Sequence, residues 1–132
     1  MFSTKGRYAL RIMIDIAEQT PGELVPLKDT ADRLGVSKKY LEIIAKELVK
    51  AKLISGASGK HGGYALTRAP EEYTVGEIIE IMEGPIAPIA CLLPDAEECP
   101  KKETCRTLSM WKEFQKLEKD FFFGKKLSDL VQ

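Results

Sequence analysis

Two helical patterns joined by a three-residue turn that contains one glycine constrain the fold of this sequence more than any other feature. Residues 27–34 predict a short helix, and Gly35 follows it where a helix end favours a left-handed residue. Ser37 is a good N-cap for a longer helix over residues 38–52. That helix has a charged outer face, which together with the glycine turn predicts a helix-turn-helix. Its apolar residues recur at helical spacing and form one stripe, made of Leu41, Ile44, Leu48 and Ala51.

A glycine-rich hairpin follows the second of these helices. Residues 53–55 and 64–66 are typical of short strands, and four of the eight residues between them are glycines. Such a segment cannot be helical, because glycine loses too much conformational freedom in a helix. Lys60 and His61 make the hairpin basic. An ordinary surface hairpin is the simpler interpretation, but order, spacing and charge favour the wing of a winged helix.

Two further segments surround this core pattern. A helix over residues 4–19 is predicted from apolar residues at helical spacing. Thr74 and Glu77 form a capping box that opens another helix, which runs to about Met82. Residues 89–102 carry no helix or strand signal, and long loops of this kind are usually functional or disordered.

A last helix is predicted from about Thr104 to Phe123, with a large apolar stripe at positions 108, 111, 114, 117 and 121. A helix of about 20 residues is about 30 Å long, as long as a small domain is wide. We therefore expect this stripe to pack against a second copy of the chain. The expected fold class is mainly α with a small β-wing, divided into a winged helix-turn-helix DNA-binding domain (1–83), a cysteine-containing loop (84–103) and a dimerisation helix with a C-terminal tail (104–132).

Charge is distributed unevenly, although the chain is neutral overall. Residues 1–68 hold 12 Lys and Arg against 7 Asp and Glu, whereas residues 69–132 hold 8 against 13. The positive first half suggests that it meets a polyanion; chance clustering on solvated faces is the alternative. No apolar run approaches the roughly 18 residues of a membrane span, and the first residues lack the apolar core of a signal peptide. We expect a cytoplasmic protein with no membrane partner.

Three cysteines, Cys91, Cys99 and Cys105, lie within fifteen residues. An odd number so confined is a poor disulfide framework and a better start on a metal site. Thiolates are soft ligands suited to iron–sulfur clusters, zinc or copper(I). Zinc knuckles usually pair cysteines about two to four residues apart, and this sequence has no such pair. These residues leave an iron–sulfur cluster and free thiols as the alternatives.

Several short motifs occur in a specific order along the chain. They are residues 3–10 (STKGRYAL), 35–37 with 40–42, 62–64 (GGY) and 74–79 (TVGEII), followed by the three cysteines and Trp111. With this set, the sequence resembles the Rrf family of winged-helix bacterial transcriptional regulators over essentially its whole length. The resemblance implies a homodimeric transcription factor, often a repressor, that binds a palindromic operator in double-stranded DNA.

The resemblance places the second helix of the helix-turn-helix in the major groove and the wing along the minor groove. Lysines there would attract phosphates. Glu42 can accept from a cytosine amino group, and a salt bridge with a neighbouring lysine is an equal alternative. Ser58 stands where the family's cluster regulator has an arginine, so the operator preference can differ. The expected DNA-binding residues are Ser37, Lys38, Lys39, Tyr40, Glu42 and Lys46 on the helix and Ser58, Gly59, Lys60 and His61 on the wing.

The resemblance also implies that Cys91, Cys99 and Cys105 hold an iron–sulfur cluster, either [2Fe-2S] or [4Fe-4S], with an unknown fourth ligand. The family's cluster regulator has a histidine where this chain has Leu108. The nitric-oxide sensor has an aspartate where this chain has Arg7. Both fourth ligands that the resemblance offers are therefore absent from this chain. The fourth ligand could be missing or a small molecule; the candidates within the chain are Asp95, Glu97, Glu98, Glu103 and Ser109.

We therefore expect a regulator, not an enzyme, whose operator binding responds to iron–sulfur status, redox state or nitric oxide. The main alternative is a cluster-free regulator of the same family, controlled by thiol oxidation or a partner protein. A small-molecule effector is left open. A small iron–sulfur electron carrier is the third hypothesis. The chain lacks a phosphate-binding glycine motif and a nucleophile–histidine pair, which argues against an enzyme.

Overall fold

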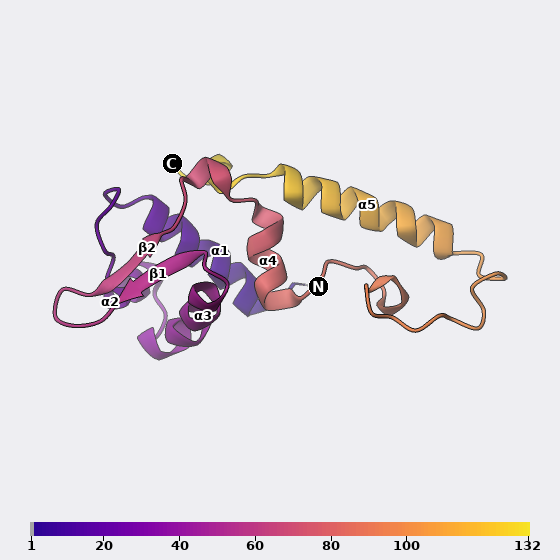
Figure 1. Cartoon of the computed structure of the whole chain (residues 1–132), viewed down its shortest axis with the longest axis horizontal. Coiled ribbons are helices and arrows are strands. Elements are labelled where there is room, and N and C mark those ends of the chain that lie inside the picture. The colour runs from indigo at the N-terminus through magenta and orange to yellow at the C-terminus, as the bar shows by residue number, and fades with distance from the viewer. Residues whose placement is uncertain (1) are drawn as a thin grey trace.

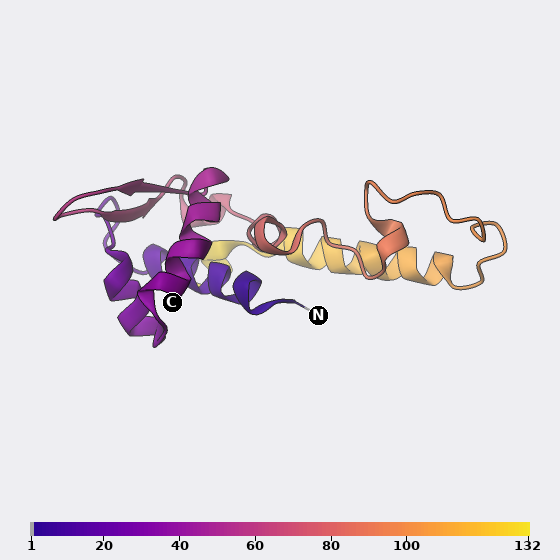
Figure 2. The same cartoon turned by 90° about the horizontal axis from the view of Figure 1, so that it is seen from below.

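The computed structural model describes residues 2–132 and shows an elongated molecule, with a helical body from which one long helix reaches away (Figures 1 and 2). The hairpin projects from one end, and the cysteine-containing segment lies at the other. This confirms the expected mainly α fold with a small β-wing. None of the helices described in these residues is long and apolar enough to cross a membrane. The elements are α1 (Thr4–Ala17), α2 (Leu27–Leu34), α3 (Lys38–Lys50), β1 (Ile54–Ala57), β2 (Gly63–Leu66), α4 (Val75–Glu83) and α5 (Leu108–Gly124), with 3₁₀ turns at Pro70–Glu72, Ala90–Leu92 and Leu127–Asp129.

Local capping explains where two helices begin and one ends. The Ser37 hydroxyl accepts a hydrogen bond from the Tyr40 N–H at the start of α3. Thr74 and Glu77 form the predicted capping box of α4, because each side chain accepts from the backbone N–H of the other residue. Gly35 ends α2 with a φ of 70°, the left-handed conformation predicted for it.

The wing is a three-part structure and not a free hairpin. β1 and β2 pair antiparallel, with Ile54 opposite Leu66. Tyr64 also exchanges two backbone hydrogen bonds with Val25, at 2.8 and 2.9 Å, so the segment before α2 joins the sheet. A Cβ on Gly63 would lie only 2.6 Å from the Val25 carbonyl. A larger residue there would force the hairpin away from α2.

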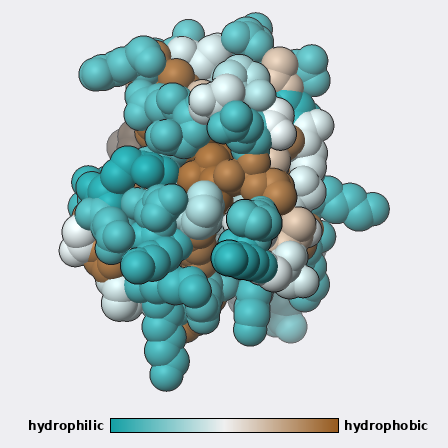
Figure 3. All heavy atoms as spheres, turned by 90° about the vertical axis from the view of Figure 1, so that its left-hand side faces the viewer, coloured by the Kyte–Doolittle hydropathy of each residue, from teal (hydrophilic) through white to brown (hydrophobic). Residues whose placement is uncertain are grey.

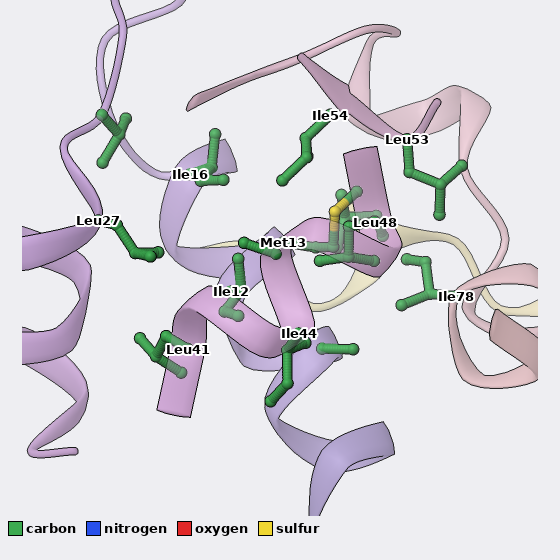
Figure 4. Packing of buried hydrophobic residues seen from close by; sticks show 14 of the residues in the cluster. Ile12, Met13, Ile16, Leu27, Leu41, Ile44, Leu48, Leu53, Ile54 and Ile78 are labelled. Atoms are coloured by element: carbon green, nitrogen blue, oxygen red, sulfur yellow. The ribbon is translucent and has the colours of Figure 1, made fainter. Parts of the chain in front are cut away.

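The hydrophobic core lies between α1, α3 and α4, and the base of the hairpin closes one side of it (Figure 4). Leu41, Ile44 and Leu48 point from α3 into this core and are fully buried, as predicted. Ala51, the fourth residue of the predicted stripe, lies past the end of α3 and is exposed. Ile12 of α1 packs between these side chains, and each such burial contributes roughly 1.5–3 kcal/mol.

A buried polar network joins α1 to α2. The Asp15 carboxylate accepts hydrogen bonds from the Thr30 hydroxyl at 2.8 Å and from Arg33 Nε and Nη2 at 2.7 and 2.9 Å. Burial alone would raise the pKa of the Asp15 carboxyl, but the hydrogen bonds from Arg33 and Thr30 and the charge of Arg33 outweigh it and lower that pKa. This bidentate contact sets the orientation of α2 on α1.

The chain returns to the helical body after α5. Leu127 is fully buried in the same core as α1, and its N–H donates to the Tyr73 carbonyl at 3.1 Å. α4 approaches α5 closely where Gly76 faces Phe123, because a Cβ on Gly76 would lie 2.6 Å from the Phe123 ring. The C-terminal end of α5 is therefore anchored in the helical body.

The ends of α1 and α3 differ from the predicted ones by two residues. α1 ends at Ala17 and α3 at Lys50, not at Gln19 and Lys52. Lys52 adopts a left-handed conformation with a φ of 63°, which ends the helical hydrogen bonding and turns the chain toward β1. Apolar periodicity cannot reveal such a turn, because the turn depends on a backbone torsion.

α5 also begins later than predicted, at Leu108 and not at Thr104. Residues 101–104 form a turn, and Thr107 occupies the N-cap position. The predicted single stripe is wrong as well, because its residues lie on two sides of the helix. Leu108 and Trp111 are half-buried on the inner side, whereas positions 114, 117 and 121 are exposed. Helical spacing of 3, 3, 3 and 4 drifts around the helix, which explains the division.

Replacing Asp15 with asparagine should lower the free energy of unfolding by about 1–3 kcal/mol at neutral pH, because Arg33 loses its charged partner. The lowered folded pKa makes this stabilisation fully present above the unfolded carboxyl pKa of roughly 3.9. It is lost as the pH falls through the folded value. Urea denaturation of both proteins at neutral pH and at a series of acidic pH values measures the effect.

Asp120→Asn is the matched control for this prediction. It removes a carboxylate from the fully exposed pair that Asp120 forms with Lys116, at 2.7 Å on α5. Exposed pairs contribute little, so its free energy of unfolding should stay close to that of the wild type. Equal losses in the Asp15 and Asp120 variants would contradict a special role for the buried network.

Candidate functional site

A concavity of about 690 Å³ lies between α3, the start of α2 and the wing. Its lining combines apolar side chains, such as Leu27, Val49 and Tyr64, with a set of lysines. Figure 3 views this end of the molecule and shows hydrophobic surface surrounded by hydrophilic side chains. The lysines that line the concavity are Lys28, Lys38, Lys46 and Lys60.

The concavity brings together most of the residues predicted to contact DNA, although they belong to two separate elements. Six of the ten line it: Lys38, Glu42, Lys46, Ser58, Gly59 and Lys60. The other four lie outside its lining: Ser37, Lys39, Tyr40 and His61. α3 and the wing therefore form one concave surface, rimmed by positive charge.

Two of the four residues outside the lining have structural contacts of their own. The Ser37 hydroxyl caps α3 by accepting the Tyr40 N–H at 3.1 Å. The half-buried Tyr40 ring packs edge-on against Tyr8 of α1, with 5.7 Å between ring centroids. The orientation of Tyr40 is therefore set by α1. Lys39 and His61 are exposed.

Glu42 forms the salt bridge that the sequence offered as one of its two roles. Lys38 Nζ lies 3.9 Å from Glu42 Oε1, one helical turn away on α3. Both side chains are exposed, and exposed pairs of this kind contribute little to stability. The contact therefore does not prevent Glu42 from turning toward a base.

Lys28 is a residue of this surface that sequence analysis did not select. It lies in the first turn of α2 and lines the same concavity as Lys46 of α3. A lysine in the first helix of a predicted helix-turn-helix is the sequence signal that could have suggested it. The separation in sequence between α2 and the wing concealed how close the three elements lie.

The buried side chain of Tyr73 holds the wing in place relative to α3. Its hydroxyl donates to the Leu53 carbonyl at 2.7 Å and accepts from the N–H groups of Thr67 at 2.9 Å and Arg68 at 3.0 Å. Leu53 directly precedes β1, whereas Thr67 and Arg68 directly follow β2. One hydroxyl thus ties together both strands at the root of the wing.

A second pocket, of about 380 Å³, lies at the opposite end of the molecule, against the first turns of α5. Cys91, Cys99 and Cys105 all line it, and each has an exposed, free thiol. The three cysteines therefore border the same pocket. The other lining residues are Leu92, Ala96, Glu97, Glu98, Lys102, Leu108 and Lys112.

The donor set of this pocket fits an iron–sulfur cluster in its chemistry. Thiolates are the usual ligands of such clusters, and Lys102 and Lys112 place positive charge beside the negative charge that three thiolates would bring. In the part of the chain that the structure describes, no three Cys, His, Asp or Glu side chains stand close enough to hold a metal ion. Binding would therefore require the thiols to move closer together. Outside one short 3₁₀ turn, the segment has no helix or strand that opposes such a movement.

Only some of the candidate residues for a fourth ligand line this pocket. Only Glu97 and Glu98 line it. Leu108 lines it too, which places an apolar side chain on the pocket wall where the resemblance has a histidine. Arg7 is exposed on α1. The other candidates, Asp95, Glu103 and Ser109, lie outside the lining.

Gln115 of α5 holds the cysteine-containing segment against the helix. Its Nε2 donates to the carbonyls of Ile86 and Leu92, at 3.2 Å each. Because Leu92 directly follows Cys91, this contact fixes the position of that cysteine on α5. Glu80 of α4 accepts from the Ile86 N–H at 2.7 Å, which anchors the start of the same segment.

Cys105 lies just before α5, and its Sγ is 3.6 Å from the Thr107 hydroxyl. Hydrogen bonds from that hydroxyl and from the backbone of Thr107 and Leu108 lower the pKa of the Cys105 thiol. The start of α5 supplies these backbone donors. Cys105 is therefore an exposed thiol whose thiolate is favoured.

Comparison with known proteins gives the same overall picture for the whole chain. A family model described as "Rrf2: Iron-dependent Transcriptional regulator" matches residues 2–132. The sequence is 38% identical over 116 residues to Protein rrf2 of Nitratidesulfovibrio vulgaris, which covers 86% of this chain and 75% of that protein. It is 36% identical over 129 residues to the HTH-type transcriptional regulator CymR of Bacillus subtilis, and the aligned region covers 98% of this chain and 88% of CymR.

Solved structures agree with these sequence matches. The structure of CymR, described as the global cysteine regulator of B. subtilis, superposes with a TM-score of 0.81 at 35% identity and covers 99% of this chain and 95% of its own. The structure of IscR from T. potens superposes with a TM-score of 0.74 at 32% identity and covers 98% of this chain and 85% of its own.

Replacing Thr107 with alanine should slow the alkylation of Cys105 near neutral pH. Loss of the hydroxyl donor raises the pKa of the thiol, so a smaller fraction is present as the reactive thiolate. Site-resolved iodoacetamide labelling of the metal-free protein, followed by mass spectrometry from about pH 6 to 9, should show the Cys105 profile moving to higher pH. Labelling of Cys91 in the same sample is the internal reference. Thr107→Ser keeps the hydroxyl and is the matched control; an unchanged profile in the alanine variant would refute this role of Thr107.

Proposed function

This chain belongs to the Rrf2 family of transcriptional regulators, and we propose that it is a homodimeric repressor whose operator affinity depends on an iron–sulfur cluster held by Cys91, Cys99 and Cys105. Its relatives are named transcriptional regulators, and the family consists of DNA-binding regulators and not of enzymes. The observation that carries the cluster proposal is that all three cysteines line one pocket beside α5. The description of the family as iron-dependent supports it.

On this proposal α3 enters the major groove and the wing follows the adjacent minor groove. The sugar–phosphate strand between the two grooves would then lie along the concavity, where lysines attract phosphates. Lys46 and Lys28 would contact this strand from two different helices. Glu42 would discriminate between bases, because its carboxylate repels phosphates but accepts from a cytosine amino group.

At the cysteine pocket, the three thiolates would bind the cluster, and Lys102 and Lys112 would offset part of their negative charge. Leu108 would exclude water from one wall of the pocket. When bound, such a cluster would supply iron chemistry that is sensitive to oxidants and to nitric oxide. Three thiolate ligands are compatible with [2Fe-2S] and with [4Fe-4S].

The proposed dimer interface is the outer side of α5. Met110, Phe114, Leu117 and Phe121 are 52%, 46%, 63% and 59% exposed, respectively. Their spacing of four, three and four residues places them on one side of the helix. Large apolar side chains gathered on one exposed surface are typical of an interaction site. A two-fold axis would pack this side against the same side of a second copy.

α5 provides the connection between the two ends of the molecule. Gln115 holds the segment that carries Cys91, and past the end of the helix Leu127 bonds to Tyr73 at the root of the wing. A rearrangement of the cysteine-containing segment would therefore shift α5. In a dimer, such a shift would change the distance between the two recognition helices and so the population that fits the operator.

A cluster-free regulator controlled by thiol oxidation or a partner protein is the second candidate. The exposure of Cys105 and the lowered pKa of its thiol favour it, because the thiolate is the form that oxidants attack. The similarity to CymR, described as a global cysteine regulator, is a further reason to consider it. In this alternative, modification of Cys105 would rearrange the same segment.

Leu117→Glu should convert the dimer into a monomer, because a two-fold contact would bury two carboxylates facing each other. Sedimentation velocity measures the change in mass. Lys119→Ala alters an exposed residue two positions further along α5 and is the control, which should stay dimeric. A Leu117→Glu protein that is as dimeric as the wild type would exclude the outer side of α5 as the interface.

Anaerobically purified protein should contain iron and acid-labile sulfide, and replacing any one of the three cysteines with serine should remove most of both. Operator affinity, measured by gel retardation, should differ by about tenfold or more between loaded and metal-free protein.

The Lys46→Ala variant tests the proposed phosphate contact independently of the cluster. It should weaken operator binding of both forms equally and reduce the slope of log affinity against log salt by about one.

Equal operator affinity of the loaded and metal-free proteins would rule out the sensing mechanism. Iron-free protein that binds the operator, and that takes up no iron and sulfide on anaerobic reconstitution, would instead support control by thiol oxidation or a partner protein.

A further inference from the structure

The cysteine pocket supplies three thiolates, and its lining identifies the side chain that can complete the set. We propose that the Glu97 carboxylate is the fourth protein ligand of the iron–sulfur cluster. This inference rests on the proposed function, because it requires a cluster on the three cysteines.

The pocket holds very few side chains that can bind iron in addition to the cysteines. Two carboxylates line it, those of Glu97 and Glu98. The remaining lining consists of apolar side chains and two lysines, whose ammonium groups have no lone pair for a metal. The chain's single histidine, His61, lies on the wing at the far end of the molecule.

The two carboxylates differ in their surroundings. Glu98 Oε1 lies 3.7 Å from Lys102 Nζ, one turn along the chain. The Glu98 side chain is 79% exposed and points largely into solvent. No salt bridge engages Glu97 among residues 2–132. Among the described residues, Glu97 is therefore the pocket carboxylate that has no lysine partner.

The position of Glu97 in the sequence suits this role. It lies two residues before Cys99, so the backbone separates their Cα atoms by at most about 7 Å. The segment around it has neither helix nor strand. Any movement that brings Cys99 toward the other two thiols therefore carries Glu97 with it.

A carboxylate also gives the site a distinct chemistry. Carboxylate oxygen is a harder ligand than thiolate sulfur and is accepted by iron, although it holds a cluster less firmly than a fourth thiolate would. The iron bound to Glu97 would be the one most easily lost to a chelator. A ligand set of three sulfurs and one oxygen thus predicts a cluster that is stable enough to isolate and labile enough to signal.

The test compares variants that differ only at the fourth position. Wild type, Glu97→Gln, Glu97→Cys, Glu98→Gln and Glu103→Gln are reconstituted anaerobically with iron and sulfide. Cluster loss in excess EDTA is followed by visible absorption, and the reduced cluster is examined by EPR. Glu97→Gln should lose its cluster roughly tenfold faster or more, because an amide is a poor iron ligand. Glu97→Cys should lose it more slowly and give a changed EPR spectrum, whereas the Glu98 and Glu103 variants should match the wild type.

A second-site change tests the assignment independently. Leu108 lines the same pocket, so Leu108→His offers an imidazole to the vacated iron. In the Glu97→Gln background it should restore the slow loss of the cluster, and pulsed EPR should detect a directly bound nitrogen. Unchanged far-UV circular dichroism and unchanged operator binding by the metal-free proteins would show that each variant is folded.

The outcomes separate this inference from the proposal on which it rests. Wild-type protein that holds no iron and sulfide overturns both. Wild-type protein with a cluster that Glu97→Gln retains equally long, with the same EPR spectrum, overturns the assignment of Glu97 alone. Faster loss in Glu98→Gln than in Glu97→Gln overturns it as well and transfers the role to Glu98.

Discussion

The buried side chain of Tyr73 is the contact on which the arrangement of this molecule depends. Its hydroxyl joins the residues that enter and leave the wing, and its carbonyl accepts from Leu127 after the end of α5. The root of the wing and the segment that follows α5 therefore meet at one residue, through its hydroxyl and its backbone carbonyl. Because Tyr73 is fully buried, each of its hydrogen bonds would be costly to break without replacement. A shift of α5 would therefore displace Tyr73 and, with it, the root of the wing.

The two ends of the molecule are built on opposite principles. The concavity between α3 and the wing is formed by elements that are held in place by local contacts. These include the cap at Ser37 and the ion pair of the buried Asp15 with Arg33. The cysteine pocket is formed by an irregular segment that is held mainly at Gln115 and Glu80. A rigid surface suits the reading of a fixed DNA shape, whereas a loosely held segment can close around a ligand and open when the ligand is lost.

Features that depend on neighbouring residues could be predicted from the sequence. The left-handed Gly35, the cap at Ser37 and the capping box of Thr74 and Glu77 all follow from hydrogen bonds within a few residues. The burial of the α3 stripe follows from helical periodicity. The start of α5 could not be predicted, because its first turn competes with the turns around the last cysteine. The place of Lys28 beside the wing was also missed, since it depends on how α2 packs on α1.

The sequence by itself determined the chemistry: a glycine-separated pair of helices, a basic hairpin, three thiols and no histidine near them. Side-chain type and helical period are local properties, so they can be read without a fold. Only the tertiary structure decided which groups share a space. It placed residues of α3 and the wing in one concavity, gathered the three cysteines with Glu97 and Leu108 in one pocket, and left the outer side of α5 uncovered. The packing of the core brings α3 and the wing together, whereas the contacts of Gln115 and Glu80 hold the cysteine-containing segment against α5.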